Sequence, residues 1–141
     1  MRYAYPATFA EASDGVSVTF PDVPEAITWG PTREEARKRS AGALISALSI
    51  YVEKNRRSPK RSAARGREVV AVTALEAMKL ALHDAMLEAQ VSNRELAGRL
   101  GLEESAVRRL RDPLQRSPIG SVESALKLLG KRVGVSVSDA V

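Results

Sequence analysis

The residues best suited to recognition chemistry are polar or basic and lie between positions 92 and 111. An arginine side chain can donate two hydrogen bonds to the edge of a guanine, and a serine hydroxyl can bond a base or a phosphate. Polar side chains at the start of a helix are positioned to contact backbone phosphates. The candidate DNA-binding residues chosen on these grounds are Asn93, Arg94, Ser105, Arg108 and Arg109. Their types and spacing predict binding of nucleic acid.

Two short helices must present these side chains. Ser92 and Glu95 form a capping box, which predicts the start of the first helix. Gly101 can adopt the positive φ that ends a helix. A second helix over about residues 103–111 then follows, until Asp112 and Pro113 stop it. This pattern is typical of a helix-turn-helix, whose second helix commonly enters the major groove of DNA.

The second helix divides its residues between two faces. Val107 and its apolar neighbours face the first helix, so Arg108 and Arg109 point to solvent. Glu103 and Glu104 lie at the end that usually enters the groove, where carboxylates repel phosphate. Attraction to the positive end of the helix dipole explains both acids without DNA, and whether they contact a cytosine stays open.

The composition limits the chemistry that the chain can perform. The chain has 141 residues, 44% of them hydrophobic, which is enough for one medium domain or two small ones. Cysteine is absent, which excludes disulfides, thiolate metal sites and cysteine nucleophiles. Apolar runs are too short for a signal peptide or a membrane span, so we expect a soluble cytoplasmic protein without membrane contacts.

The positive charge is concentrated in one segment. The net charge is +5, yet residues 53–67 alone carry seven basic and one acidic side chain. Residues 68–141 carry ten of each sign, so the segment with the helix pair is neutral. The basic segment is compatible with a solvated, mobile connector or with an electrostatic arm for nucleic acid, and the sequence leaves its role open.

The first half of the chain alternates between strand and helix patterns. Asp14 and Gly15 form a turn signal between two strand-like runs, which predicts a hairpin. Pro6 indicates an edge or a bulge. Thr32 and Glu35 form a second capping box at the start of a long helix. We expect strands over residues 2–9, 16–20, 26–30 and 68–73 and a helix over about 32–54, in the order β-β-β-α-β.

The second half is mainly helical. Apolar residues spaced by three and four predict a helix over about residues 74–89, with Lys79 and His83 on its exposed surface. Ser121 caps a further helix over 122–129, and alternating valines predict a strand over 133–137. That strand has no partner within its own module, so a second copy of the chain is expected to supply one in a homodimer.

Three segments resemble the HicB antitoxin family. The turn at residues 14–15 precedes a strand, the sequence Phe-Pro-Asp-Val-Pro-Glu-Ala follows at 20–26, and Thr-Arg-Glu-Glu-Ala occupies 32–36 after Gly30. Members commonly carry a related Phe-Pro-Asp element followed by Gly-Asp-Thr-Arg-Glu-Glu-Ala. Here Pro31 replaces the usual acidic residue. Residues 74–130 are similar to the helix-turn-helix subgroup of the same family.

This resemblance implies a fold of class α+β, built from two modules. Residues 1–73, including the basic segment 53–67, would form a degenerate ribonuclease H-like module that binds the toxin. Residues 74–141 would form the helix-turn-helix module, which binds DNA and dimerises.

The resemblance also implies two partners. Such proteins neutralise a HicA-like toxin, a small protein that cleaves messenger RNA, and repress their own operon by binding operator DNA. The assembly would be a homodimer or a tetramer of two such dimers. We expect the toxin to contact the connector after the second strand and the tryptophan beyond it, because tryptophan is enriched at interfaces. The expected toxin-binding residues are Phe20, Asp22, Val23, Glu25 and Trp29.

Two other functions stay open. A working ribonuclease H site needs clustered carboxylates that hold two metal ions, and none occurs between Arg2 and Ala10 of the first strand. Asp22 is explained by a turn, and Glu34 and Glu35 by the helix start. We therefore expect no catalysis, cofactor or metal. The alternatives are a metal-dependent nuclease and a stand-alone transcription regulator whose first module senses a small ligand.

Overall fold

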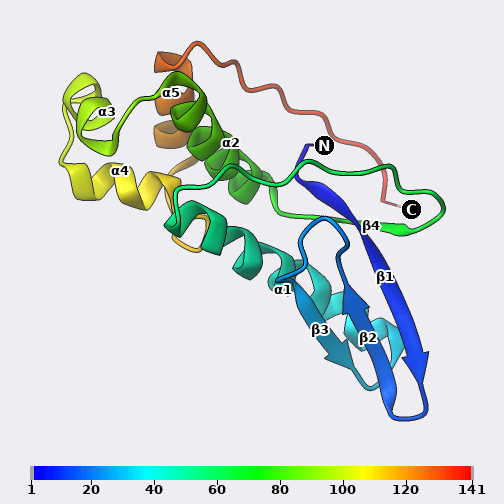
Figure 1. The fold of residues 1–141 in the computed structure, drawn as a ribbon. Helices are drawn as coiled ribbons and strands as arrows, with labels where there is room; N and C mark the ends of the chain where they lie inside the picture. Colours follow the sequence, from blue (N-terminus) through cyan, green and yellow to red (C-terminus); the bar gives the residue numbers. More distant parts are fainter. Residues whose placement is uncertain (1, 141) are drawn as a thin grey trace.

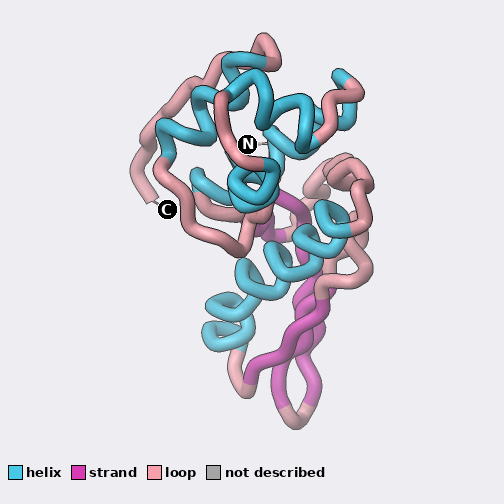
Figure 2. Tube along the Cα trace, turned by 90° about the vertical axis from the view of Figure 1, so that its left-hand side faces the viewer, coloured by secondary structure: helices cyan, strands magenta, loops and turns pink. Residues whose placement is uncertain are grey.

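A four-stranded antiparallel sheet and five helices make up residues 2–140, the part of the chain that this computed structural model describes. The sheet and α1 lie at one end of the molecule, and the other helices gather at the opposite end (Figures 1 and 2). Among these residues, no helix is both long enough and apolar enough to span a membrane. In chain order the elements are β1 (Ala4–Ala12), β2 (Gly15–Thr19), β3 (Ile27–Gly30), α1 (Arg33–Glu53), β4 (Glu68–Ala71), α2 (Ala74–Ala89), α3 (Asn93–Leu100), α4 (Glu104–Arg111) and α5 (Ile119–Leu128).

The strand order in the sheet is β3-β2-β1-β4. The predicted hairpin is present, with Phe9 opposite Val18. Residues 8–12 of β1 pair with β2, whereas residues 4–7 pair with β4. Pro6 therefore lies in the part of β1 that pairs with β4 alone. Because proline has no backbone N–H to donate, it is tolerated where one side of a strand is unpaired.

Helix α1 covers one face of this sheet. It begins after Thr32, whose hydroxyl accepts a hydrogen bond from the backbone N–H of Glu35 at 3.2 Å. Its buried residues include Leu44 and Leu48, which pack with Val18 of β2 in the first hydrophobic core. The order β-β-β-α-β expected from the sequence is confirmed.

Helix α2 belongs to both halves of the molecule. Its capping box is complete, because the side chains of Thr73 and Glu76 each bond the backbone N–H of the other. Leu80 lies in the core beneath the sheet, while Leu82 and Met86 lie in a second core formed with α3, α4 and α5. The two halves are therefore continuous through one helix. The boundary between residues 73 and 74 stays a prediction.

Helices α3 and α4 occur where the sequence predicted them. Ser92 caps α3 by accepting a hydrogen bond from Glu95 N–H at 3.0 Å, and Gly101 ends it with a φ of 68°. Leu96 of α3 and Val107 of α4 are fully buried in the second hydrophobic core. The apolar spacing thus positions the two helices, and Asp112 ends α4 as expected.

Two expectations for the last part of the chain are wrong. Residues 131–140 contain no strand, and Val135 and Val137 are 83% and 92% exposed. Alternating valines favour a strand locally, but a strand needs a neighbour to bond, and this segment pairs with none of the described strands. Helix α5 begins at Ile119 after Pro118 instead of after Ser121, because the carbonyl of Pro118 already accepts hydrogen bonds from the N–H groups of Ser121 and Val122, at 3.0 and 3.4 Å.

The basic segment is anchored to the surface of the folded chain. The backbone N–H of Ser58 donates to Asp84 of α2 at 2.9 Å, and Tyr5 donates to the carbonyl of Pro59 at 2.7 Å. Ser62 donates to Asp22 through its N–H at 2.8 Å and through its hydroxyl at 3.0 Å. These bonds hold the backbone of the segment along the path seen in Figure 1.

Two glycines offer a matched test of this fold. A Cβ at Gly30 would lie 2.4 Å from the backbone nitrogen of Ala36, whereas one at Gly42 meets nothing within 4 Å. We expect Gly30→Ala to lower the free energy of unfolding by about 1–3 kcal/mol, because α1 must move off β3. Gly42→Ala lies inside α1 and should raise it by about 0.5–1 kcal/mol. Urea denaturation measures both, and equal effects would contradict the close packing of β3 and α1.

Candidate functional site

The exposed face of α4 carries the residues predicted to contact DNA. Ser105, Arg108 and Arg109 are exposed, whereas Val107 and Leu110 are buried. The division of α4 into two faces is therefore confirmed. A role of these side chains in binding DNA stays a prediction.

The two acids at the start of α4 have different surroundings. Glu103 occupies the N-cap position without a side-chain cap bond. Glu104 accepts a hydrogen bond from Arg108 at 2.7 Å, one turn further along the helix. Arg108 is therefore already engaged in an ion pair, while Arg109 is the arginine next to it on the exposed face.

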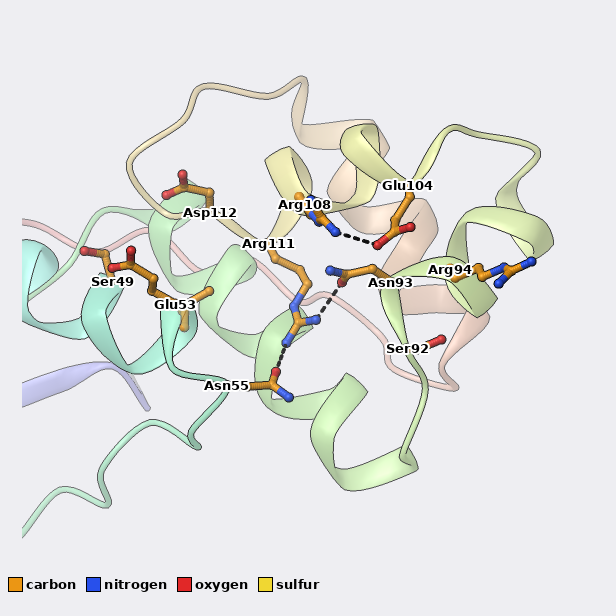
Figure 3. A pocket seen from close by; sticks show the side chains of 11 residues that line it. Ser49, Glu53, Asn55, Ser92, Asn93, Arg94, Glu104, Arg108, Arg111 and Asp112 are labelled. Atoms are coloured by element: carbon orange, nitrogen blue, oxygen red, sulfur yellow. Dashed lines mark hydrogen bonds and ion pairs between the residues drawn. The ribbon is translucent and has the colours of Figure 1, made fainter.

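The start of α3 forms one wall of a cleft of about 670 Å³. Asn93 and Arg94 both line it, together with Arg108 of α4 (Figure 3). The opposite wall is the last turn of α1 and Asn55. The structure thus brings three of the five predicted DNA-binding residues to one hollow, beside a part of the first half that sequence reasoning had not associated with them.

Lys79 is fully buried, so its predicted place on the helix surface is wrong. Its Nζ atom donates to the backbone carbonyls of Arg109 at 2.7 Å and Asp112 at 3.2 Å, and to the hydroxyl of Ser117 at 2.7 Å. Three donors thus meet three acceptors at the end of α4, where helix carbonyls lack partners and the dipole attracts a cation. Burial lowers the pKa of Lys79.

His83 is also fully buried, which contradicts its predicted exposure. Its Nε2 atom lies 2.6 Å from the carbonyl oxygen of Arg56, and its Nδ1 lies 2.6 Å from a terminal nitrogen of Arg111. Because an arginine can only donate, Nδ1 accepts, and the proton of neutral His83 is on Nε2. Burial lowers the pKa of His83, as does the nearby Arg111 guanidinium.

Arg111 joins three elements through this cluster. Its guanidinium donates to Asn93 at the start of α3 at 2.6 Å and to Asn55 after α1 at 2.9 Å, as well as to His83 of α2. Burial lowers the pKa of Arg111. Figure 3 shows the guanidinium between the two asparagines. The cluster therefore fixes α4 relative to the end of α1.

Sequence reasoning missed Lys79, His83 and Arg111. A signal for the first two was present, since α2 carries apolar residues on more than one face, including Leu80 as well as Leu82. A helix that is apolar nearly all round is buried, and its few polar side chains must then have partners. No local pattern identified those partners.

The predicted toxin-binding residues divide by exposure. Phe20 and Val23 are buried in the first core, so their side chains support the connector from beneath. Trp29 is 43% exposed on the edge strand β3, next to Ile27 at 66%. Trp29 and Ile27 are therefore available to a partner, whereas Phe20 and Val23 are not.

The two acids of the connector bond within the chain. Asp22 accepts from Ser62, as described above. Glu25 is exposed and accepts from the hydroxyl of Tyr51 at 2.8 Å, a bond that lowers the pKa of Glu25. Among residues 2–140, no group of three or more histidine, cysteine or acidic side chains is placed to hold a metal ion.

Comparison with known proteins supplies the family. A family model described as a HicB-like antitoxin of a bacterial toxin–antitoxin system matches residues 2–81. The chain belongs to the HicB-like antitoxin family. The match extends beyond the sheet module into α2, whose Leu80 packs in the first core.

Curated relatives cover nearly the whole chain. It is 38% identical to Antitoxin HicB of Pseudomonas fluorescens over 142 residues, spanning 99% of this chain and 97% of the relative. It is also 38% identical to Antitoxin HicB 2 of Photorhabdus laumondii over 129 residues, 92% of each chain. Antitoxin HicB of Escherichia coli is 33% identical over 133 residues, 93% of this chain and 96% of the relative. The resemblance noted from the sequence is confirmed.

The buried histidine predicts a pH dependence of stability. The folded state lowers the pKa of His83, whereas an unfolded chain restores it to about 6.5. The unfolded state therefore binds more protons as the pH falls below that value. We expect the free energy of unfolding to drop by up to about 1.4 kcal/mol per pH unit between roughly pH 6.5 and the folded pKa.

Urea denaturation from pH 7.5 down to 5 measures this drop. The chain has one histidine, so His83→Gln removes that titration and should flatten the profile. An unchanged slope in His83→Gln would contradict the neutral, hydrogen-bonded state assigned to the imidazole.

Proposed function

We propose that this HicB-like chain is a non-catalytic cytoplasmic antitoxin that neutralises a HicA-like, messenger-RNA-cleaving toxin and represses its own operon by binding operator DNA. The observation that carries the proposal is the family match together with the two separate exposed surfaces. One surface lies on α4, and the other lies on the edge of the sheet. Each suits binding better than bond-making, because the exposed side chains are arginines on the first and apolar groups on the second.

The DNA-binding half of the proposal rests on α3 and α4. In a helix-turn-helix, the second helix enters the major groove and the first crosses the backbone. Arg109 and Ser105 are exposed on α4 and can hydrogen-bond base edges. Arg108 can do so after exchanging its bond to Glu104 for a base or phosphate. Arg94, exposed at the start of α3, would contact phosphate.

A second copy of the chain would complete this surface. Residues 68–141 carry no net charge, so this half of one copy attracts DNA weakly without the basic segment 53–67 or a second copy. Ile119 and Leu128 of α5 are 54% and 45% exposed, and Val135 and Val137 extend beyond it. We propose that these apolar side chains meet their equivalents in a homodimer, with a tetramer as the next level of assembly. Two DNA-reading helices would then contact two half-sites.

The toxin-binding half rests on the sheet. We propose that its β-β-β-α-β order is that of a degenerate ribonuclease H-like module. Trp29 and Ile27 point away from α1 on the edge strand β3, where a protein partner can cover them. Phe20 and Val23 would hold the neighbouring connector in shape.

Replacing Arg109 should separate the two activities. We expect Arg109→Ala to weaken binding to duplexes from the region upstream of its own coding sequence by about tenfold or more, because a bidentate arginine–guanine contact is worth about 1–3 kcal/mol. Toxin binding should be unchanged. Fluorescence anisotropy measures the DNA affinity.

Arg116, exposed in the segment after α4, supplies the matched control. If Arg109→Ala and Arg116→Ala bind the upstream duplexes equally well, α4 does not read DNA and this half of the proposal fails.

Replacing Trp29 tests the other surface. Trp29→Ala should weaken binding of the small protein encoded beside this gene by about thirtyfold or more, since buried tryptophans at interfaces commonly contribute at least about 2 kcal/mol. Isothermal calorimetry on the purified pair measures this, with Leu114→Ala, at an exposed apolar residue after α4, as the control on the other half. Full toxin affinity in Trp29→Ala would show that the partner binds elsewhere.

A further inference from the structure

The cleft in Figure 3 has walls from both halves of the molecule. Ser92, Asn93 and Arg94 form one side, at the start of α3. Ser49 and Asn55 come from the end of α1 and the residues just after it. Its volume of about 670 Å³ suits a phosphate with its attached groups and is far too small for a duplex. A ligand of this cleft is therefore a small molecule or a single chemical group of a larger one.

Arg111 lines the cleft as a buried cation whose hydrogen-bond partners are all neutral. It is 8% exposed, and its hydrogen-bond partners are two asparagine oxygens and the imidazole of His83. None of the ion pairs within residues 2–140 includes it. Its Nε atom is buried and has no hydrogen-bond acceptor. A buried charge without a counter-ion is costly, and an anion nearby offsets that cost.

The other groups of the cleft favour the same kind of ligand. The N-terminus of α3 presents backbone N–H groups and the positive end of a helix dipole. Arg94 is exposed beside it, and the side-chain amides of Asn55 and Asn93 can donate hydrogen bonds. This donor set matches the acceptor oxygens of a phosphate.

Three acids also line the cleft. Glu104 is bound to Arg108, and the carboxylate of Asp112 accepts from the backbone N–H of Leu114 at 2.9 Å. Glu53 is exposed in the last turn of α1. The acids therefore balance the formal charge of the lining, but Arg111, the buried one of its three cations, has no ion pair with any of them.

We infer that this cleft is a phosphate-binding site, built jointly by α1, α3 and α4 around Arg111. The inference rests on the proposed function in one respect, since a DNA backbone phosphate is the source that binding through α4 would supply. A free phosphate shares the same chemistry. The new feature of this proposal is the wall from α1. Through it, the half proposed to bind the toxin would also contact the phosphate backbone of DNA.

Nuclear magnetic resonance on the full wild-type chain tests the site without a folding risk. The probes are inorganic phosphate and, separately, a duplex from the region upstream of the coding sequence. We expect both to shift the Nε–H resonance of Arg111 and the side-chain amides of Asn55 and Asn93. If the duplex shifts Arg109 while those three resonances stay unchanged, the cleft takes no phosphate, although α4 still reads DNA.

Variants then measure the contribution of each wall. Arg94→Gln and Asn55→Gly should each weaken duplex binding by about tenfold, and Arg94→Gln, which removes a charge, should also reduce the slope of log affinity against log salt by about 0.9. Glycine suits position 55 because Asn55 has a φ of 56°. Arg116→Gln is the control outside the cleft. Affinities equal to that control would overturn the inference.

Failure of the proposed function is distinguishable from failure of this site. If no upstream duplex binds, or if Arg109→Ala has no effect on its binding, the proposal that α4 binds operator DNA is wrong. A shift of Arg111 by inorganic phosphate would then still support an anion site that uses a free phosphate. Absence of any shift with either probe would overturn the site itself.

Discussion

The hydrogen bonds from α2 into the end of α4 are the constraint on which the arrangement of this molecule depends. Lys79 and His83 lie one turn apart on α2 and are fully buried. A buried ammonium must satisfy its three donors, and Lys79 does so on two carbonyls and a hydroxyl around the end of α4. Displacing α4 would strand that charge, so its orientation is fixed by polar bonds as well as by the apolar core.

His83 extends the same constraint to α1. Its ring lies between the carbonyl of Arg56 and the guanidinium of Arg111. Asn55 adds a second bond from the end of α1 to Arg111. Asp84, the next residue on α2, accepts from Tyr3 at 2.8 Å and from Ser58 N–H. The polar side of α2 thus ties the sheet, the basic segment and α4 to one another.

This arrangement bears on how the proposed activities would share one chain. The surface proposed for the toxin and the surface proposed for DNA lie at opposite ends, joined by α2 and the Arg111 cluster. If a phosphate also uses the wall from α1, its binding acts on the hydrogen bond between Asn55 and Arg111, which joins the two halves. By linkage, any effect of the toxin on DNA affinity would be matched by an equal effect of DNA on toxin affinity.

Local signals in the sequence determined the elements. N-cap signals at Thr32 and Ser92 and the spacing of apolar residues identified α1, α2, α3 and α4 within about a residue, because these effects act within one or two turns. The family was also evident from short motifs in the first 36 residues. The tertiary structure decided the rest. It buried Lys79 and His83, left the valines after α5 unpaired, and placed Asn55 against Arg111, 56 residues away. Those outcomes depend on which distant atoms lie within hydrogen-bonding reach, and no periodicity along the chain encodes that.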